Sequence, residues 1–282
     1  MTYHYWYFFD VAERLQPFTE AGQPKVTAFE CGVIALEYES PKPTSGLEIQ
    51  AAKFLPTVLQ KYATHLESPY VELLSEEYCL LHATPRDFRP EEIARFVRGD
   101  ERALSPSEVQ DILANAVNYY EGDRLVAGWA AAYVEGHLQP AYDLLRYANV
   151  QLLEFRRYDA QLTTVLSNAY ADLKARRRWS LRSKSKHLYR ILLHIRESTE
   201  RMDNAVKFLS DTHSARIYRL AAARTGADDY RKLVESKWNT AQETYRFMLD
   251  QFHHTRAFVL EFMVVAILII DLYYLLVGKA LP

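Results

Sequence analysis

The spacing of hydrophobic residues changes once along this chain, near residue 139. Before that point, short apolar runs of strand length alternate with helical segments and are separated by glycine, proline and polar turns. After it, turn residues become scarce and apolar residues recur at steps of three and four, which is typical of long amphipathic helices. The pattern predicts an α+β head domain over residues 1–138, a long-helix domain over 139–256 and a final apolar helix over 257–277.

The first part of the head domain is predicted to form a β-sheet. The aromatic run Tyr3–Val11 favours a strand, and Val26–Tyr38 gives two short strands that meet at Gly32 in a hairpin or a bulge. The polar residues 16–25 before them predict a loop. Leu47–Tyr62 carries apolar residues at helical spacing.

The second part of the head domain is predicted to add a strand, a helix and a hairpin. Glu77–Ala83 has the composition of a strand. Ser105 can cap a helix that has Pro106 in its first position and ends near Asn115. The stretch 116–134 holds a turn at residues 121–123 between two apolar runs, which predicts the hairpin.

Three long helices are predicted after Pro140. The first has a coiled-coil-like stripe, with Asp159 on it, and the second spans Lys186–Arg224 and stops at Gly226. The third begins near Asp228 and continues into the apolar run. Helices of this length pack as an antiparallel bundle or as an oligomeric coiled coil. The stripe of the first helix consists of Leu145, Ala148, Leu152, Phe155, Leu162, Leu166, Ala169 and Leu173.

The apolar run over residues 257–277 contains no glycine or proline and predicts a single transmembrane helix. About 20 such residues cross the hydrocarbon core of a bilayer, so the run is long enough for a tail anchor. The alternative is a buried helix in a protein core, which two acidic residues favour. The residues assigned to the anchor are Phe258, Leu260, Glu261, Phe262, Val264, Val265, Ile267, Leu268, Ile269, Ile270, Asp271, Tyr273 and Tyr274.

Asp271 is the least expected residue in that run. An aspartate near the centre of a bilayer costs roughly 2.5–3.5 kcal/mol, so it would pair with another subunit or turn toward the headgroups. The first arrangement predicts a homo-oligomer that forms through the long helices and the anchor. The second requires no partner other than membrane lipid.

Positive charge gathers at the turn predicted between the first two long helices. Such a basic helix tip, with Trp179 and Tyr189 interleaved, binds RNA or anionic lipid, or is simply solvated. The overall net charge of −2 gives no reason to expect a nucleic-acid partner, so this interpretation depends on the local cluster. The residues of the tip are Lys174, Arg176, Arg177, Arg178, Arg182, Lys184, Lys186 and Arg190.

Composition and motifs indicate no catalytic centre, metal site or cofactor. Cys31 and Cys79 are far apart and without CxxC spacing, which argues against structural zinc and a disulfide scaffold and favours a reducing compartment. Both thiols are expected to be small buried groups. The histidines lack the spacing of a metal site, and nucleotide-binding or nucleophile motifs are missing from the sequence. A mean hydropathy of −0.25 excludes a polytopic membrane protein.

Three stretches resemble the required-for-meiotic-nuclear-division (YagE-type) family. They are Phe29–Ile34, residues 119–129 and residues 256–271, with Phe262 in place of the family's Trp and Asp271 in place of its Glu. The resemblance implies a protein anchored at its C-terminus. The family's mitochondrial members are inner-membrane proteins that assemble into large complexes and support mitochondrial translation, and the family offers no catalytic residues to carry over.

These observations predict a non-enzymatic scaffold or tether that displays α+β heads at a membrane surface. The N-terminus has neither the apolar core of a signal peptide nor the arginines of a transit peptide, so the expected location is the bacterial inner membrane, with the head in the cytoplasm. The alternative function is an RNA- or ribosome-binding module that uses the basic tip at residues 174–190.

Overall fold

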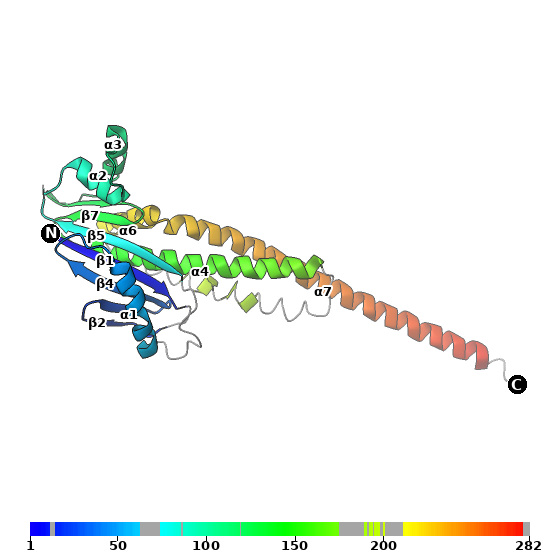
Figure 1. The fold of residues 1–282 in the computed structure, drawn as a ribbon. Helices are drawn as coiled ribbons and strands as arrows, with labels where there is room; N and C mark the ends of the chain where they lie inside the picture. The colour runs from blue at the N-terminus through cyan, green and yellow to red at the C-terminus, as the bar shows by residue number, and fades with distance from the viewer. Residues whose placement is uncertain are drawn as a thin grey trace. The chain divides into compact units, whose positions relative to one another are not determined.

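The computed structural model describes most of the chain (Figure 1). The described residues are 1–11, 15–62, 74–85, 87–118, 120–174, 189–190, 192–193, 195–197, 200 and 211–278, and the side chains of 172–174, 248–249, 251–259 and 274–278 are not among them. They divide into two compact units. Unit 1 comprises residues 1–160 and 198–235, and unit 2 comprises 161–197 and 236–282.

Unit 1 is built on a seven-stranded sheet with the order β2-β3-β4-β1-β5-β7-β6. Neighbouring strands are antiparallel except for β5 and β7, which are parallel. The parallel pair places α2 and α3 in the connection between two adjacent strands. The strands are β1 (Thr2–Asp10), β2 (Phe18–Glu20), β3 (Lys25–Phe29), β4 (Val33–Ser40), β5 (Ser75–Ala83), β6 (Arg124–Ala127) and β7 (Ala131–Glu135).

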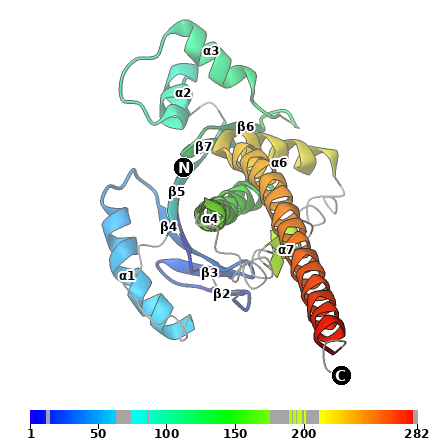
Figure 2. The same cartoon turned by 90° about the vertical axis from the view of Figure 1, so that its right-hand side faces the viewer.

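Helices cover both faces of this sheet (Figure 2). On one face, α1 packs against β1, β3 and β4, and α2 and α3 pack against β5, β6 and β7. On the other face, α4 and α6 cover the centre of the sheet. The described helices are α1 (Leu47–Tyr62), α2 (Pro90–Arg98), α3 (Pro106–Ala114), α4 (Ala141–Lys174), α6 (Thr212–Thr225) and α7 (Ala227–Gly278).

Strand β1 explains why both faces are covered. Its residues alternate between the two faces, and they are bulky and buried on each: Trp6 and Phe8 join the cluster beneath α4, whereas Tyr3 and Tyr7 join clusters on the opposite face. A strand that is apolar on both faces needs a layer on each side. The sheet is therefore the middle layer of three.

Local sequence signals place most of the predicted elements correctly. The strands β1, β4 and β5, the hairpin around Gly32 and the helix α1 are confirmed. The Ser105 cap is also confirmed, because its hydroxyl oxygen accepts a hydrogen bond from the Glu108 amide.

Three expectations about the head were wrong. The loop predicted at 16–25 contains the short edge strand β2. Helix α2 was not predicted, because only three of its nine residues are buried and its apolar pattern in the sequence is therefore short. The second hairpin is formed by β6 and β7 within residues 124–135. Val117 contributes only an isolated bridge to Leu125.

The predicted helix over Lys186–Arg224 does not continue through its C-terminal part. Asp211 has extended backbone angles, and its carboxylate accepts hydrogen bonds from the amides of His213 and Ser214, so a new helix, α6, begins there. The predicted stop is right, since Gly226 ends α6 with a φ of 85°. Helix α7 then runs from Ala227 into the apolar region, as predicted.

Unit 2 contains the end of α4, a described helical stretch within 189–197, and α7 from Ser236. Its buried positions come from all three segments: Leu162, Leu166, Ala169, Leu192, Ile195 and Ala241. The ring of Tyr189 stacks on Tyr245 at 5.6 Å, and Arg196 lies 5.8 Å from the centre of the Trp238 ring. The order of these two pairs shows that the middle segment runs antiparallel to α7. The described residues show no coiled coil, so the coiled-coil interpretation of these helices is not supported.

No helix in the part of the chain that the structure describes is long and apolar enough to cross a membrane. The prediction of a transmembrane tail anchor over 257–277 is therefore wrong, and so is the single-pass inner-membrane location. The apolar part of α7 includes two exposed acids, Glu261 and Asp271, which lower its hydropathy.

Replacement of Gly128 tests the contact between α2 and the β6–β7 turn. A Cβ atom on Gly128 would lie 2.4 Å from the carbonyl oxygen of Val97, so Gly128→Ala is expected to destabilise unit 1 by roughly 2–4 kcal/mol. The control is Gly22→Ala, because a Cβ there would meet nothing nearer than 3.4 Å. Urea denaturation should show a lower midpoint for the first variant only, and equal midpoints would contradict this packing.

Candidate functional site

A buried carboxylate lies at the centre of the most concentrated polar cluster in unit 1. Strand β4 presents Val33, Ala35 and Glu37 to the face covered by α4, so the alternation of the strand puts a charged residue where an apolar one is expected. Only 4% of Glu37 is exposed. A charge in that position is stable only if it is paired and hydrogen-bonded.

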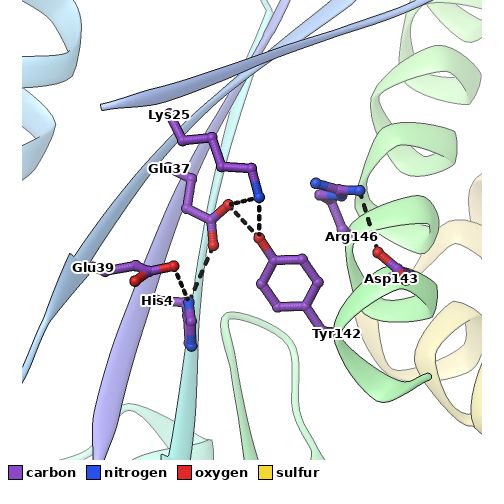
Figure 3. A network of polar contacts seen from close by, with 7 residues as sticks. All are labelled: His4, Lys25, Glu37, Glu39, Tyr142, Asp143 and Arg146. Carbon is purple, nitrogen blue, oxygen red and sulfur yellow. Dashed lines mark hydrogen bonds and ion pairs between the residues drawn. The ribbon is translucent and has the colours of Figure 1, made fainter. Parts of the chain in front are cut away.

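Three side chains satisfy Glu37 (Figure 3). His4 Nδ1 lies 3.1 Å from Glu37 Oε1 and donates to it, since an ionised carboxylate can only accept. The hydroxyl of Tyr142, on α4, donates a short hydrogen bond to Oε2. Lys25 Nζ lies 3.5 Å from the same Oε2 and 3.4 Å from the Tyr142 hydroxyl. We call these four residues, with Glu39, the Glu37 cluster.

Strand register brings the cluster together. Glu37 is directly opposite Lys25 in β3 and Trp6 in β1, and His4 is directly opposite Glu39. Residues opposite each other in antiparallel strands point to the same face. His4 consequently has a second carboxylate nearby, with Glu39 Oε1 at 3.5 Å from Nδ1.

These contacts keep Glu37 ionised. Burial by itself raises the pKa of Glu37, but the hydrogen bonds from His4 and Tyr142, helped by Trp6 and by the charge of Lys25, lower that pKa to about 2. The pKa of the Tyr142 phenol is raised, first by burial and then by its hydrogen bond to Glu37. The negative charge therefore stays on the carboxylate and the proton stays on the phenol.

Two cations border the cluster where it meets solvent. Lys25 Nζ lies 5.5 Å from the centre of the Tyr142 ring, and the Arg146 guanidinium lies 5.2 Å from the same centre. Arg146 also pairs with Asp143 at 3.3 Å. The Tyr142 ring is thus held between a hydrogen bond at its tip and two cations at its sides.

A second buried ion pair lies at the other end of β1, and we call it the Arg157 cluster. Arg157 Nη1 is 2.6 Å from Asp10 Oδ1, and its Nη2 donates to the Cys31 carbonyl at 2.9 Å. Glu154 accepts a hydrogen bond from Tyr158 and lies 3.8 Å from Arg157. This cluster joins α4 to the end of β1 and to the β3–β4 turn.

The two cysteine thiols are unsuited to nucleophilic chemistry. Burial raises the pKa of Cys31 to about 12, and the nearby Glu154 adds to that rise. Burial and then Glu77 raise the pKa of Cys79 to about 12 as well. Cys79 lies in β5 as predicted, whereas Cys31 lies in the turn before β4, and both are partly buried.

A cleft of about 350 Å³ opens beside β6 and the start of α6. Its apolar lining includes Leu125, Val134 and Ile217. Two ion pairs line it as well: Asp123 lies 3.6 Å from His137, and Glu135 lies 3.9 Å from Arg124.

The residues predicted to form an anchor lie on one continuous helix, α7. Those from Leu260 to Tyr273 are exposed, except for the partly exposed Ala266, and the side chains of Phe258 and Tyr274 are outside the described part. Most of the predicted basic tip also lies outside the described residues. Of its members, Arg190 is exposed on a helical stretch, and only the backbone of Lys174 is described.

Sequence reasoning missed the Glu37 cluster. One signal was present, because the run Val33–Tyr38 is apolar except for Glu37 and alternation assigns that glutamate to a buried face. The partner on α4, Tyr142, is 105 residues away in sequence and carries no motif. Only the packing of α4 on the sheet brings the two together.

A protein-family model matches part of the chain. The model of a protein family described as "Uncharacterized protein MJ0711, N-terminal domain" matches residues 16–137, which is less than half of the chain. No curated protein and no solved structure matches.

This match contradicts the resemblance to the required-for-meiotic-nuclear-division family. Two of the three stretches that suggested it contain turn glycines. Gly32 and Gly122 have φ angles of 87° and 91°, which glycine adopts most readily. The third stretch, residues 256–271, is an apolar part of α7. Such short stretches do not distinguish one family from another.

Glu37→Gln should show how strongly the cluster stabilises unit 1. The pKa of Glu37 falls from 4.5 to about 2 on folding, so the charge is expected to contribute about 3 kcal/mol to the free energy of unfolding. Because the folded pKa is the lower one, this stability is present above pH 4.5 and is lost as the pH falls toward 2.

Urea denaturation of the wild type and Glu37→Gln across this pH range measures the effect. The difference between them should be large at pH 7 and should shrink in acid, while the exposed control Glu101→Gln matches the wild type throughout. If the difference in the free energy of unfolding between the two proteins does not change with pH, these contacts do not lower the pKa of Glu37.

Arg157→Met tests the second buried pair. Removal of the guanidinium leaves Asp10 buried without its ion pair, so a loss of roughly 3–5 kcal/mol is expected in thermal or urea unfolding. The double variant Arg157→Met/Asp10→Asn should lose less than the two single losses added together, because the unpaired charge is gone. Additive losses would argue against direct coupling.

Proposed function

We propose that this protein is a non-enzymatic scaffold that assembles with copies of itself through the apolar end of α7. One observation carries the proposal: eleven large apolar side chains of α7 between Leu260 and Tyr273 are each 47–65% exposed. These eleven are Leu260, Phe262, Met263, Val264, Val265, Ile267, Leu268, Ile269, Ile270, Leu272 and Tyr273. We call this segment the apolar end of α7.

The exposed residues surround the helix. Fourteen consecutive residues make about four turns, and eleven large apolar positions among them leave no side of the helix polar. A helix that is apolar on every side is stable only when other groups cover it. In a self-assembling protein, the same segment of other copies is a complementary cover, because apolar surface associates without directional requirements.

The size of the surface supports a stable assembly. With about half of each side chain exposed, the segment presents roughly 1,000 Å² of apolar area, against about 800 Å² per partner in an ordinary protein interface. An apolar patch of this size is rare on a protein that remains a monomer. Several helices around a common axis would cover it most completely.

The described part of unit 1 supports a structural role over a catalytic one. Its most buried charges are committed to one another: Glu37 is held by His4, Tyr142 and Lys25, and Arg157 by Asp10. Both thiols are protonated at neutral pH. In the proposed assembly, each copy exposes its unit 1 on the surface of the oligomer.

The molar mass of the full chain in solution tests the proposal. The wild type is expected to elute as a multiple of 32.8 kDa in size-exclusion chromatography with light scattering. The double variant Ile267→Asp/Ile270→Asp, at positions 58% and 53% exposed, should shift the mass toward one chain, because buried unpaired carboxylates oppose association.

The matched control is Leu233→Asp, which changes an exposed leucine on the same helix outside the apolar end. It should keep the mass of the wild type. A monomeric wild type at micromolar concentration, or an unchanged mass for the double variant, would refute assembly through this segment.

A further inference from the structure

We infer that His4, Glu37 and Glu39 form a binding site for a divalent transition-metal ion, with zinc as the best fit. The inference does not depend on the proposed assembly. Each of the three residues offers one ligand atom, and these atoms lie within 4.8 Å of one another. An imidazole nitrogen with two carboxylate oxygens is a common three-residue set for zinc, which leaves a fourth position open.

The distances between the ligand atoms fit a tetrahedral ion. Bonds of about 2.1 Å in a tetrahedron place neighbouring ligand atoms about 3.4 Å apart. His4 Nδ1 lies 3.1 Å from Glu37 Oε1 and 3.5 Å from Glu39 Oε1. The Glu39 side chain is 55% exposed, so it can adjust its position at little cost.

The surroundings hold Glu37 in the orientation that binding needs. Tyr142 and Lys25 both contact Oε2, and this leaves Oε1 directed at His4 (Figure 3). The His4 ring packs edge-on against the Tyr142 ring at 5.4 Å, which fixes its orientation. Groups that orient ligands in this way raise the affinity of a metal site.

A buried donor also lies beside Glu37. Trp6 is fully buried directly opposite Glu37, and its indole N–H helps to lower the pKa of that carboxylate. Among the described residues, its Nε1 makes no hydrogen bond of good geometry. The N–H of Trp6 therefore acts on the same carboxylate that would bind the metal.

Charge also favours a dication. Glu37 and Glu39 bring two negative charges to His4, and Lys25 contacts the other oxygen of Glu37, Oε2, and not the one beside His4. When no ion is bound, the proton on His4 Nδ1 lies between the two carboxylates. A metal ion would take the place of that proton on Nδ1, and the neutral ring would then carry its proton on Nε2.

Cobalt and zinc titrations of the metal-free full chain test the site. One equivalent of Co²⁺ should give the intense visible absorption of tetrahedral coordination, and Zn²⁺ should displace it. A competing chromophoric chelator then gives the affinity for zinc. Glu39→Gln is the informative variant, because its exposed side chain can be changed without disturbing the core, and it should weaken zinc binding at least tenfold.

The matched control is Glu91→Gln, an exposed glutamate on α2, which should bind zinc as the wild type does. A tenfold or greater loss in Glu39→Gln alone supports the site. Equal affinity in Glu39→Gln and the wild type overturns it, since the ion would then be bound elsewhere, and so does the lack of tetrahedral absorption with one equivalent of Co²⁺. The titration is read per chain, so a failed assembly proposal leaves its outcome unchanged.

Discussion

The structure of unit 1 depends on how α4 lies along β1. Apolar residues of α4, among them Leu145, Ala148 and Leu153, cover the buried face that carries Trp6 and Phe8. At one end of this contact Tyr142 meets Glu37, and at the other end Arg157 meets Asp10. A hydrophobic stripe alone would permit the helix to slide, whereas two polar contacts a fixed distance apart do not.

The two clusters hold α4 at two points on the sheet. Glu37 lies opposite Trp6, four residues before Asp10 in β1, so the two carboxylates are roughly 13 Å apart along the strands. Tyr142 and Arg157 lie roughly 22 Å apart along α4, and each reaches one of the two carboxylates. Only one register of α4 therefore satisfies both buried carboxylates at once. Each charge costs free energy when it is buried, and the contacts offset that cost only in this arrangement. We regard the clusters as the reason that this face of the sheet has a single packing.

The two units differ in how their apolar and charged side chains are covered. In the described part of unit 1, the buried charges of Glu37, Asp10 and Arg157 meet their partners within the same unit, and both faces of the sheet are covered. The apolar end of α7, in unit 2, has large apolar side chains exposed on every side. A surface of this kind is stabilised by association, so we propose that the protein assembles through this helix. The Glu37 cluster is the place where we propose that a metal ion binds.

The sequence by itself determined the elements whose signals are local. Aromatic and β-rich composition predicted β1, β4 and β5, the Ser105 cap predicted the start of α3, and Gly226 predicted the end of α6, because each signal lies within a few residues of the feature it sets. The apolar run of α7 was also evident from the sequence. Its assignment to a membrane was wrong. A hydrophobic run indicates only that its side chains avoid water, and it does not indicate whether lipid or protein covers them.

Only the tertiary structure decided what the buried polar residues do. Glu37 meets Lys25 and Trp6 through strand register, and it meets Tyr142 across 105 residues of chain. The grouping of His4, Glu37 and Glu39 likewise follows from the pairing of β1 with β4. Hydrogen bonds and metal ligation depend on distances of a few ångströms, and such distances between residues far apart in sequence are set by packing alone.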